Sequence, residues 1–152
     1  MLRYESVGQV KPSAVQAIFR EIGALDRAWW RGAIGLDASE EDRPAILRGK
    51  TALFHAHGIP DGDDVFMAFA DAVFILERLA DWAKRFRIKW RIRMRDEDWG
   101  AVDPTGMTRP LWEQMGKWSA RAGVFQSGKL GWSVPEERRA ELLARYADRK
   151  EV

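Results

Sequence analysis

Cysteine is absent from this sequence of 152 residues, and histidine occurs only twice. Without thiols the chain has no disulfide, no thiolate nucleophile and no cysteine-ligated zinc, so a metal site would need His, Asp and Glu ligands. The first ten residues contain Arg3 and Glu5 and lack the run of about seven or more apolar residues that a secretory signal requires. We therefore expect a cytoplasmic protein.

Long apolar runs are missing as well. The longest, residues 65–76, has twelve members and is interrupted by Asp71, whereas a membrane-crossing helix needs roughly 20 apolar residues. This stretch therefore predicts a core helix, and we expect no membrane partner. The chain also shows no internal repeat, low-complexity tract or linker, so we expect a single domain over residues 1–152, with a tail that frays from about residue 148.

No short motif identifies a reaction. No Ser or Thr occupies a nucleophile elbow, and no glycine-rich phosphate loop follows a predicted strand. His55 and His57 would share one face of a strand, but on a helix they point roughly 200° apart and cannot hold one metal ion. Because the surrounding signals favour a helix, a metal-assisted hydrolase at His57 with Asp61 or Asp63 is the least favoured hypothesis. We expect no enzyme, no cofactor and no metal.

Asp71 is the only charge within residues 65–76. If it were buried, its carboxylate would be a candidate general base with a raised pKa. However, a charged residue recurs every seven positions along this stretch, which predicts an exposed stripe on one helix. The members of that stripe are Asp64, Asp71, Arg78 and Arg85. We therefore expect Asp71 to face solvent.

The clearest structural signal is a change of period after residue 87. Residues 64–86 predict a long central helix, apolar on nearly every side in its first half and capped by Asp63 or Asp64. From residue 88 to 95 apolar and basic side chains alternate strictly, which predicts a strand. The sequence therefore predicts an α+β protein, mostly helical, with about five helices around a central apolar helix (64–86) and a small antiparallel β-hairpin (88–95/99–102) packed against them.

Caps and prolines mark the first two of the remaining elements. Ser13 and Gln16 have the spacing of a capping box, which predicts a helix from Ser13 to about Ala33. Asp42 as a cap and Gly58 as a terminator predict a second helix between them.

Three more segments complete the prediction. Residues 2–10 fit either a short edge strand or a loop. Proline signals predict helices from about residue 109 to Gly123 and from about residue 135 onward. Two short apolar pieces predict a second small hairpin at residues 124–134.

Charge is distributed unevenly along the chain. Residues 1–80 hold 9 basic and 12 acidic residues, net −3, whereas residues 81–152 hold 16 and 11, net +5. The alternating strand concentrates this charge in a basic row about 20 Å long, from the roughly 3.3 Å rise per strand residue. The row consists of Lys89, Arg91, Arg93 and Arg95. It is either a solvated face that also guards a sheet edge or a docking strip for phosphates or an acidic protein.

Tryptophan is abundant, with eight residues, and most of them lie on predicted apolar faces. Trp90 points away from the basic row, which disfavours stacking of single-stranded bases beside the arginines. Trp112 leaves the apolar line of its helix, and Trp132 lies in a loop-like stretch. Trp29 and Trp30 are neighbours on a helix, so one must leave the face that the other occupies. Exposed tryptophans are typical interface anchors, so these positions favour a binding protein.

Taken together, these patterns predict a small non-enzymatic intracellular protein-binding module. It would dock an acidic protein partner through a basic strand face and exposed tryptophans, with binding residues Lys89, Arg91, Arg93, Arg95, Trp112 and Trp132. An inhibitor or immunity-type protein that neutralises a cognate effector is one concrete member of this class. Arg outnumbers Lys 18 to 7, which suits a GC-rich bacterial genome. The alternative hypothesis is nucleic-acid binding through the phosphate backbone.

Overall fold

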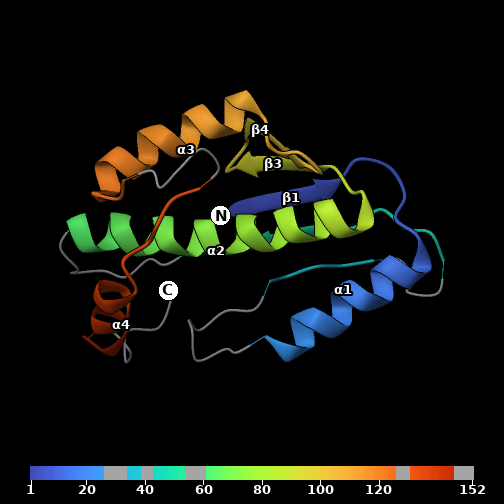
Figure 1. The fold of residues 1–152 in the computed structure, drawn as a ribbon, viewed down its shortest axis with the longest axis horizontal. Helices are drawn as coiled ribbons and strands as arrows, with labels where there is room; N and C mark the ends of the chain where they lie inside the picture. The colour runs from blue at the N-terminus through green and yellow to red at the C-terminus, as the bar shows by residue number, and fades with distance from the viewer. Residues whose placement is uncertain (26–33, 39–42, 54–60, 126–130, 146–152) are drawn as a thin grey trace.

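A five-stranded antiparallel sheet packed against one long helix forms the centre of the protein (Figure 1). The structure is a computed structural model that describes residues 1–25, 34–38, 43–53, 61–125 and 131–145. The strand order is β2-β1-β3-β4-β5. The strands are β1 (Leu2–Ser6), β2 (Arg48–Thr51), β3 (Trp90–Met94), β4 (Glu97–Asp103) and β5 (Gly106–Met107).

Four helices are present among the described residues. They are α1 (Pro12–Ala24), α2 (Asp61–Phe86), α3 (Arg109–Ala122) and α4 (Glu136–Arg145). Helix α2 runs along the sheet, α3 packs on α2 and β4, and α4 packs on α2 (Figure 1). None of the described helices combines the length and apolar character needed to cross a membrane.

The core lies between α2 and one face of the sheet. Leu2 and Tyr4 of β1 and Trp90 and Ile92 of β3 are all buried, while the residues between them are exposed. The register places Tyr4 opposite Ile92, so these side chains share one face. The expected alternation of β3 is therefore confirmed for its interior residues, and a long helix, α2, covers the predicted helical range 64–86.

The predicted arrangement of about five helices around a central helix with a small hairpin is nevertheless wrong. The protein is α+β, but three further strands extend the hairpin into a five-stranded sheet: β1 and β2 on the β3 side and β5 on the β4 side. β1 pairs with strands on both sides, so it is not an edge strand.

The helix predicted between Asp42 and Gly58 is wrong where the structure describes it, because residues 48–51 form β2. Burial alternates from Ala45 to Thr51, with Leu47 buried and Ile46 exposed. That is a period of two, which a helix cannot match. The part of the predicted helix that carries His55 and His57 lies outside the described residues.

Several element ends also differ from the prediction. α1 begins after Lys11, whose side chain makes no capping hydrogen bond, so Ser13 lies inside the helix and does not cap it. Leu25 has extended backbone angles (φ −62°, ψ 135°), which ends α1 well before Ala33. α2 begins at Asp61, so Asp63 and Asp64 lie in its first turn.

The hairpin that contains the basic row is longer on its second strand than predicted. β4 spans residues 97–103, with a register shift opposite the Ile92–Arg93 step that indicates a bulge. Gly100 in this bulge has φ 116°, and a Cβ there would lie 2.7 Å from the Thr108 hydroxyl and 2.9 Å from the Leu111 nitrogen. The bulge therefore lets the start of α3 approach β4 closely. The second hairpin predicted at 124–134 lies partly outside the described residues.

The outer edge of β2 is bridged by a short segment around Asp37. The Asp37 N–H donates to the Arg48 carbonyl (2.7 Å), and the Arg48 N–H donates to the Asp37 carbonyl (3.1 Å). A second bridge joins Val10 and Ala45 in the same way, at 2.8 and 3.1 Å. These bridges fix the connection that leads into β2.

Candidate functional site

The side of the sheet that faces away from α2 is exposed and strongly basic. We call it the open face. It consists of alternate residues of β1, β2 and β3 and of the positions that continue them: Arg3, Glu5, Val7, Ile46, Arg48, Lys50, Lys89, Arg91 and Arg93, all exposed. Six of these side chains are cationic and one is anionic, which gives a net charge of +5.

Like charges lie directly opposite one another on this face. Lys50 of β2 is the register partner of Arg3, and Arg3 is the register partner of Arg93. Side chains in such positions have Cβ atoms about 4.5–5.5 Å apart, and like charges there are destabilising. The contacts among these three cations therefore do not favour folding, and only Arg93 has an acidic register partner, Asp98 of β4. The next row is mixed, because Glu5 lies opposite both Arg48 and Arg91.

Few of these cations are neutralised by residues that the structure describes. Among the described residues the open face holds one ion pair, Arg48 Nε to Glu5 Oε2 at 3.4 Å. Arg3, Lys50 and Arg93 form no ion pair with any described residue.

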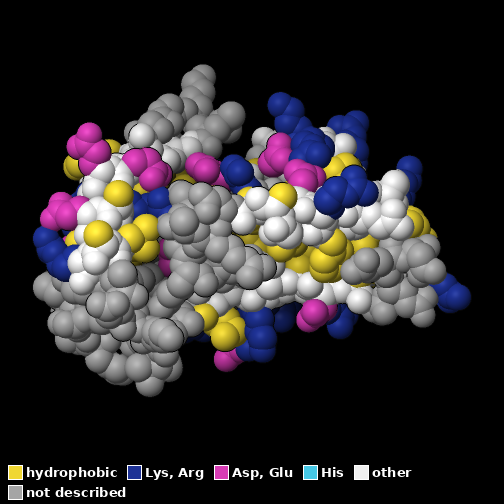
Figure 2. Space-filling view, turned by 90° about the horizontal axis from the view of Figure 1, so that it is seen from below, with side chains coloured by type: hydrophobic (Ala, Val, Ile, Leu, Met, Phe, Trp, Pro, Cys, Tyr) yellow, Lys and Arg dark blue, Asp and Glu magenta, His cyan; other side chains and the backbone are white. Residues whose placement is uncertain are grey.

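Cations elsewhere on the surface are more often paired. Arg85 contacts Glu21 (2.5 Å) and Asp81 (2.9 Å), and Arg109 contacts Glu113 (3.0 Å). Figure 2 shows acidic side chains directly beside basic ones in the half of the molecule that holds α1 and the C-terminal end of α2.

The positive charge of the open face affects the ionisable groups at its two ends. Burial lowers the pKa of the Met1 amino group, and the positive charges of Arg95 and Arg3 lower it further. At the other end, the pKa of Asp103 is lowered mainly by hydrogen bonds from the Thr105 hydroxyl (2.5 Å) and amide (2.8 Å), with a smaller contribution from Lys89. Cations thus extend over the full length of β3.

Two apolar side chains adjoin the cations. Val7 is 54% exposed and Ile46 is 39% exposed. The Ser6 N–H donates to the Leu47 carbonyl and the Val7 N–H donates to the Lys89 carbonyl, both at 2.8 Å. Continuing this register by one step places Val7 between Ile46 and Lys89, so the basic rows end in an apolar row.

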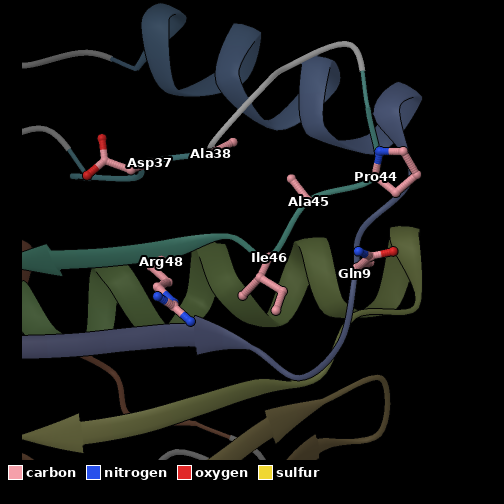
Figure 3. A pocket seen from close by; sticks show the side chains of 7 residues that line it. All are labelled: Gln9, Asp37, Ala38, Pro44, Ala45, Ile46 and Arg48. Atoms are coloured by element: carbon pink, nitrogen blue, oxygen red, sulfur yellow. The ribbon is translucent and has the colours of Figure 1, made fainter.

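A pocket of about 500 Å³ opens beside this apolar row (Figure 3). Its lining residues are Gln9, Asp37, Ala38, Pro44, Ala45, Ile46 and Arg48. In Figure 3, β1 and β2 lie in front of α2, and Ile46 and Arg48 lie on the same near side as the open face. The pocket and the open face therefore share two residues.

The structure places three of the four residues predicted for the basic row on the open face and the fourth in a turn. Lys89, Arg91 and Arg93 are exposed on the open face. Arg95 is exposed but lies beyond β3 in the turn, where its φ is 56° and its N–H donates to the Met1 carbonyl (3.1 Å). Sequence reasoning missed the cations of β1 and β2. Arg3 belongs to a short alternating stretch, residues 2–5, that could have signalled a strand, whereas the residues around Lys50 show no such alternation.

The predicted exposure of Trp132 is wrong. Its side chain is only 5% exposed and packs against Phe69 of α2, with ring centroids 5.9 Å apart. Trp112 of α3 is half-buried, and its ring lies 4.5 Å from that of Trp132. The segment before α4 folds back onto α2 and α3, which turns Trp132 inward. Trp29 and Trp30 lie outside the described residues.

The predicted exposure of Asp71 is also wrong. Asp71 is completely buried, and Arg139 of α4 is 2% exposed. Burial lowers the pKa of Arg139, while a hydrogen bond to Glu136 (2.9 Å) and the negative charge of Asp71 raise it. Asp71 thus has a buried counter-charge and is not among the residues that line the pocket. The prediction failed because α4 covers this part of α2.

No group of three or more His, Asp and Glu residues that could hold a metal occurs within the described ranges. The predicted metal ligand Asp63 instead lies near two arginines of α4, Arg138 (3.7 Å) and Arg145 (3.8 Å). His55 and His57 lie outside those ranges.

Comparisons of the chain with protein families, with curated proteins and with solved structures found no match. A functional proposal therefore depends on the geometry and charge of the open face.

Proposed function

We propose that this chain is a small non-enzymatic binding module of the cytoplasm that docks an acidic protein on its open face. The observation that carries the proposal is the row of directly opposed cations, Lys50, Arg3 and Arg93. This row is unfavourable for folding, and a partner that brings carboxylates between the cations would relieve the repulsion. Complementary charge of this kind speeds association and selects partners.

The composition of the open face favours a protein over a nucleic acid. Glu5 occupies the middle of the face and Asp98 is the register partner of Arg93, so carboxylates would meet a phosphate backbone at two positions. None of the nine described residues that make up the open face is aromatic, so none of them can stack on a base. Val7 and Ile46 instead supply exposed apolar surface next to the cations, a combination typical of protein interfaces.

An inhibitor or immunity-type protein is the specific form that we favour within this class. In this form the chain would neutralise a cognate effector by covering an acidic surface of that effector. A sheet with cations on adjacent strands suits this task, because its hydrogen-bonded backbone needs little reordering on binding.

The test compares two double variants with the same change of charge. Arg91→Glu with Arg93→Glu reverses the centre of the open face, whereas Arg20→Glu with Lys117→Glu changes exposed residues on α1 and α3. We expect labelled poly-L-glutamate, measured by fluorescence anisotropy at low salt, to bind the first variant at least about tenfold more weakly than the wild type. The second variant should bind almost as well as the wild type.

Two further measurements decide the class of partner. A labelled 20-base-pair DNA duplex, titrated at low and physiological salt, tests the nucleic-acid alternative, for which affinity falls steeply with salt. Capture from native lysate should recover acidic proteins with the wild type and the control variant, but not with the open-face variant. Recovery of the same proteins by all three, or preferential binding of the duplex over poly-L-glutamate, would overturn the proposal.

A further inference from the structure

The pocket at the end of the open face has the properties of an anchor site. It shares Ile46 and Arg48 with the open face, and four of its seven lining residues are apolar: Ala38, Pro44, Ala45 and Ile46. Building on the proposed function, we propose that the acidic partner inserts an aromatic side chain carrying an N–H or O–H donor into this pocket. The acidic residues that flank this anchor would then contact the cations.

The walls of the pocket are held in place by backbone hydrogen bonds. Asp37 and Arg48 exchange two N–H to carbonyl bonds on one side, at 2.7 and 3.1 Å. Val10 and Ala45 exchange two more on the other side. A pocket formed in this way before binding costs little ordering entropy, which is the condition under which one inserted side chain contributes most to affinity.

The pocket is large enough for an aromatic side chain, and its polar groups favour a side chain with a hydrogen-bond donor. Its volume of about 500 Å³ is well within the range of ligand pockets, roughly 300–1,000 Å³. Gln9 and Asp37, both exposed, add an amide and a carboxylate to a lining in which polar and apolar surface are about equal. An indole N–H or a tyrosine hydroxyl could donate to either group while the ring contacts the apolar walls. Tryptophan and tyrosine are also the residues that most often anchor interfaces.

The surroundings of the pocket point to a partner that is acidic as well as aromatic. Val7 and Ile46 extend the apolar lining onto the sheet, and Lys89 lies beside Val7 in the same row. The next row begins with Arg48 of the pocket itself. A bound segment would therefore pass from apolar to cationic surface within two strand positions, about 7 Å.

Two synthetic peptides test the anchor, one with a tryptophan between two runs of three glutamates and one with alanine in its place. Each carries a fluorescent label and is titrated into the wild type. We expect the tryptophan peptide to bind at least about tenfold more tightly than the alanine peptide. Equal affinity of the two peptides would overturn the anchor. If both also bound less tightly to the Arg91→Glu, Arg93→Glu variant, the proposed function would still stand.

Variants then locate the anchor. Ala38→Phe fills the pocket, and Ala120→Phe places the same side chain on the exposed side of α3 as a control. The Ala38→Phe variant should bind the tryptophan peptide and the alanine peptide with about equal affinity. Its affinity for the alanine peptide should equal that of the wild type. The control should keep the preference. A preference that survives in the Ala38→Phe variant contradicts the site.

A measurement on the wild type does not depend on how the variants fold. Benzoylphenylalanine replaces the tryptophan of the peptide, and cross-links are mapped by mass spectrometry after irradiation. We expect them at Gln9, Asp37 or Ile46. Cross-links confined to α3 or α4 would overturn the anchor, and a peptide that neither binds nor cross-links would count against both proposals.

Discussion

The two faces of the sheet are made from alternate residues of the same strands, yet they differ in polarity, charge and exposure to solvent. On the inner face Leu2, Tyr4, Trp90 and Ile92 are buried against α2. On the open face their neighbours are charged and exposed. The inner face provides the apolar burial that drives folding. The open face does not need to bury apolar side chains. Its row of opposed cations does not stabilise the fold, which is why we relate it to binding.

The largest effect should come from exchanging one side chain on the inner face. Trp90 is fully buried, with the rings of Tyr4 and Trp82 each 6.5 Å away between centroids. We expect Trp90→Ala to lower the free energy of unfolding by about 3–5 kcal/mol. Its neighbour Arg91 lies on the open face, and Arg91→Ala should change that free energy by no more than about 0.5 kcal/mol. Urea denaturation of both variants measures the difference, and similar losses would contradict the division between the faces.

The buried charges beneath α4 should give the next largest effect. Asp71 and Arg139 are both buried, and removal of one member of a buried charge pair costs about 3–5 kcal/mol because the other is left uncompensated. We expect Asp71→Leu and Arg139→Met each to be strongly destabilising. The double variant should lose clearly less than the sum of the two, as a double-mutant cycle will show. Additive losses would mean that the two charges do not interact.

A smaller loss is expected at Gly49, which lies opposite Tyr4 on the inner face. A Cβ at this position would lie 2.2 Å from Tyr4 Cε2 and 2.0 Å from the Gly35 carbonyl oxygen. We expect Gly49→Ala to cost about 1–3 kcal/mol through overpacking. Gly116 inside α3 has no atom within 4 Å of such a Cβ, so Gly116→Ala should stabilise by up to about 1 kcal/mol. Thermal unfolding of both variants tests the contrast in sign.

The smallest effect should appear on the open face and should be favourable. Arg3 is the register partner of two cations, Lys50 and Arg93, whereas Arg91 is the register partner of Glu5. We expect Arg3→Gln to raise stability by about 0.2–1 kcal/mol at low salt, because it removes like-charge contacts. This gain should shrink at about 1 M salt, where charges are screened within about 3 Å. Arg91→Gln should bring no gain, and an equal gain from both would show that local pairing does not matter.

Sequence patterns located the elements with long, regular periods and missed those that depend on distant contacts. The 26-residue α2 and the alternation of β3 are visible in the residues themselves. β2 is short and contains Gly49, and its apolar residues can also be fitted to one helical face. Its strand character becomes clear only when it pairs with β1, more than 40 residues earlier.

The candidate site shows the same limit. The cations of β3 were predicted, but a single strand cannot reveal which charges lie beside it on the neighbouring strands. The burial of Asp71 and Trp132 depends on how the chain after α3 packs onto α2, and no local pattern encodes that packing.

The bridge between Asp37 and Arg48 also limits how this protein can assemble. Both backbone groups that Arg48 would offer to an incoming strand are already used within the chain. A strand of a second polypeptide cannot pair with β2 at that position without first displacing Asp37. Edge-to-edge aggregation through this edge of the sheet is therefore disfavoured. A partner of the proposed kind would therefore contact the side chains of the open face at that position, and single substitutions would alter those contacts one at a time.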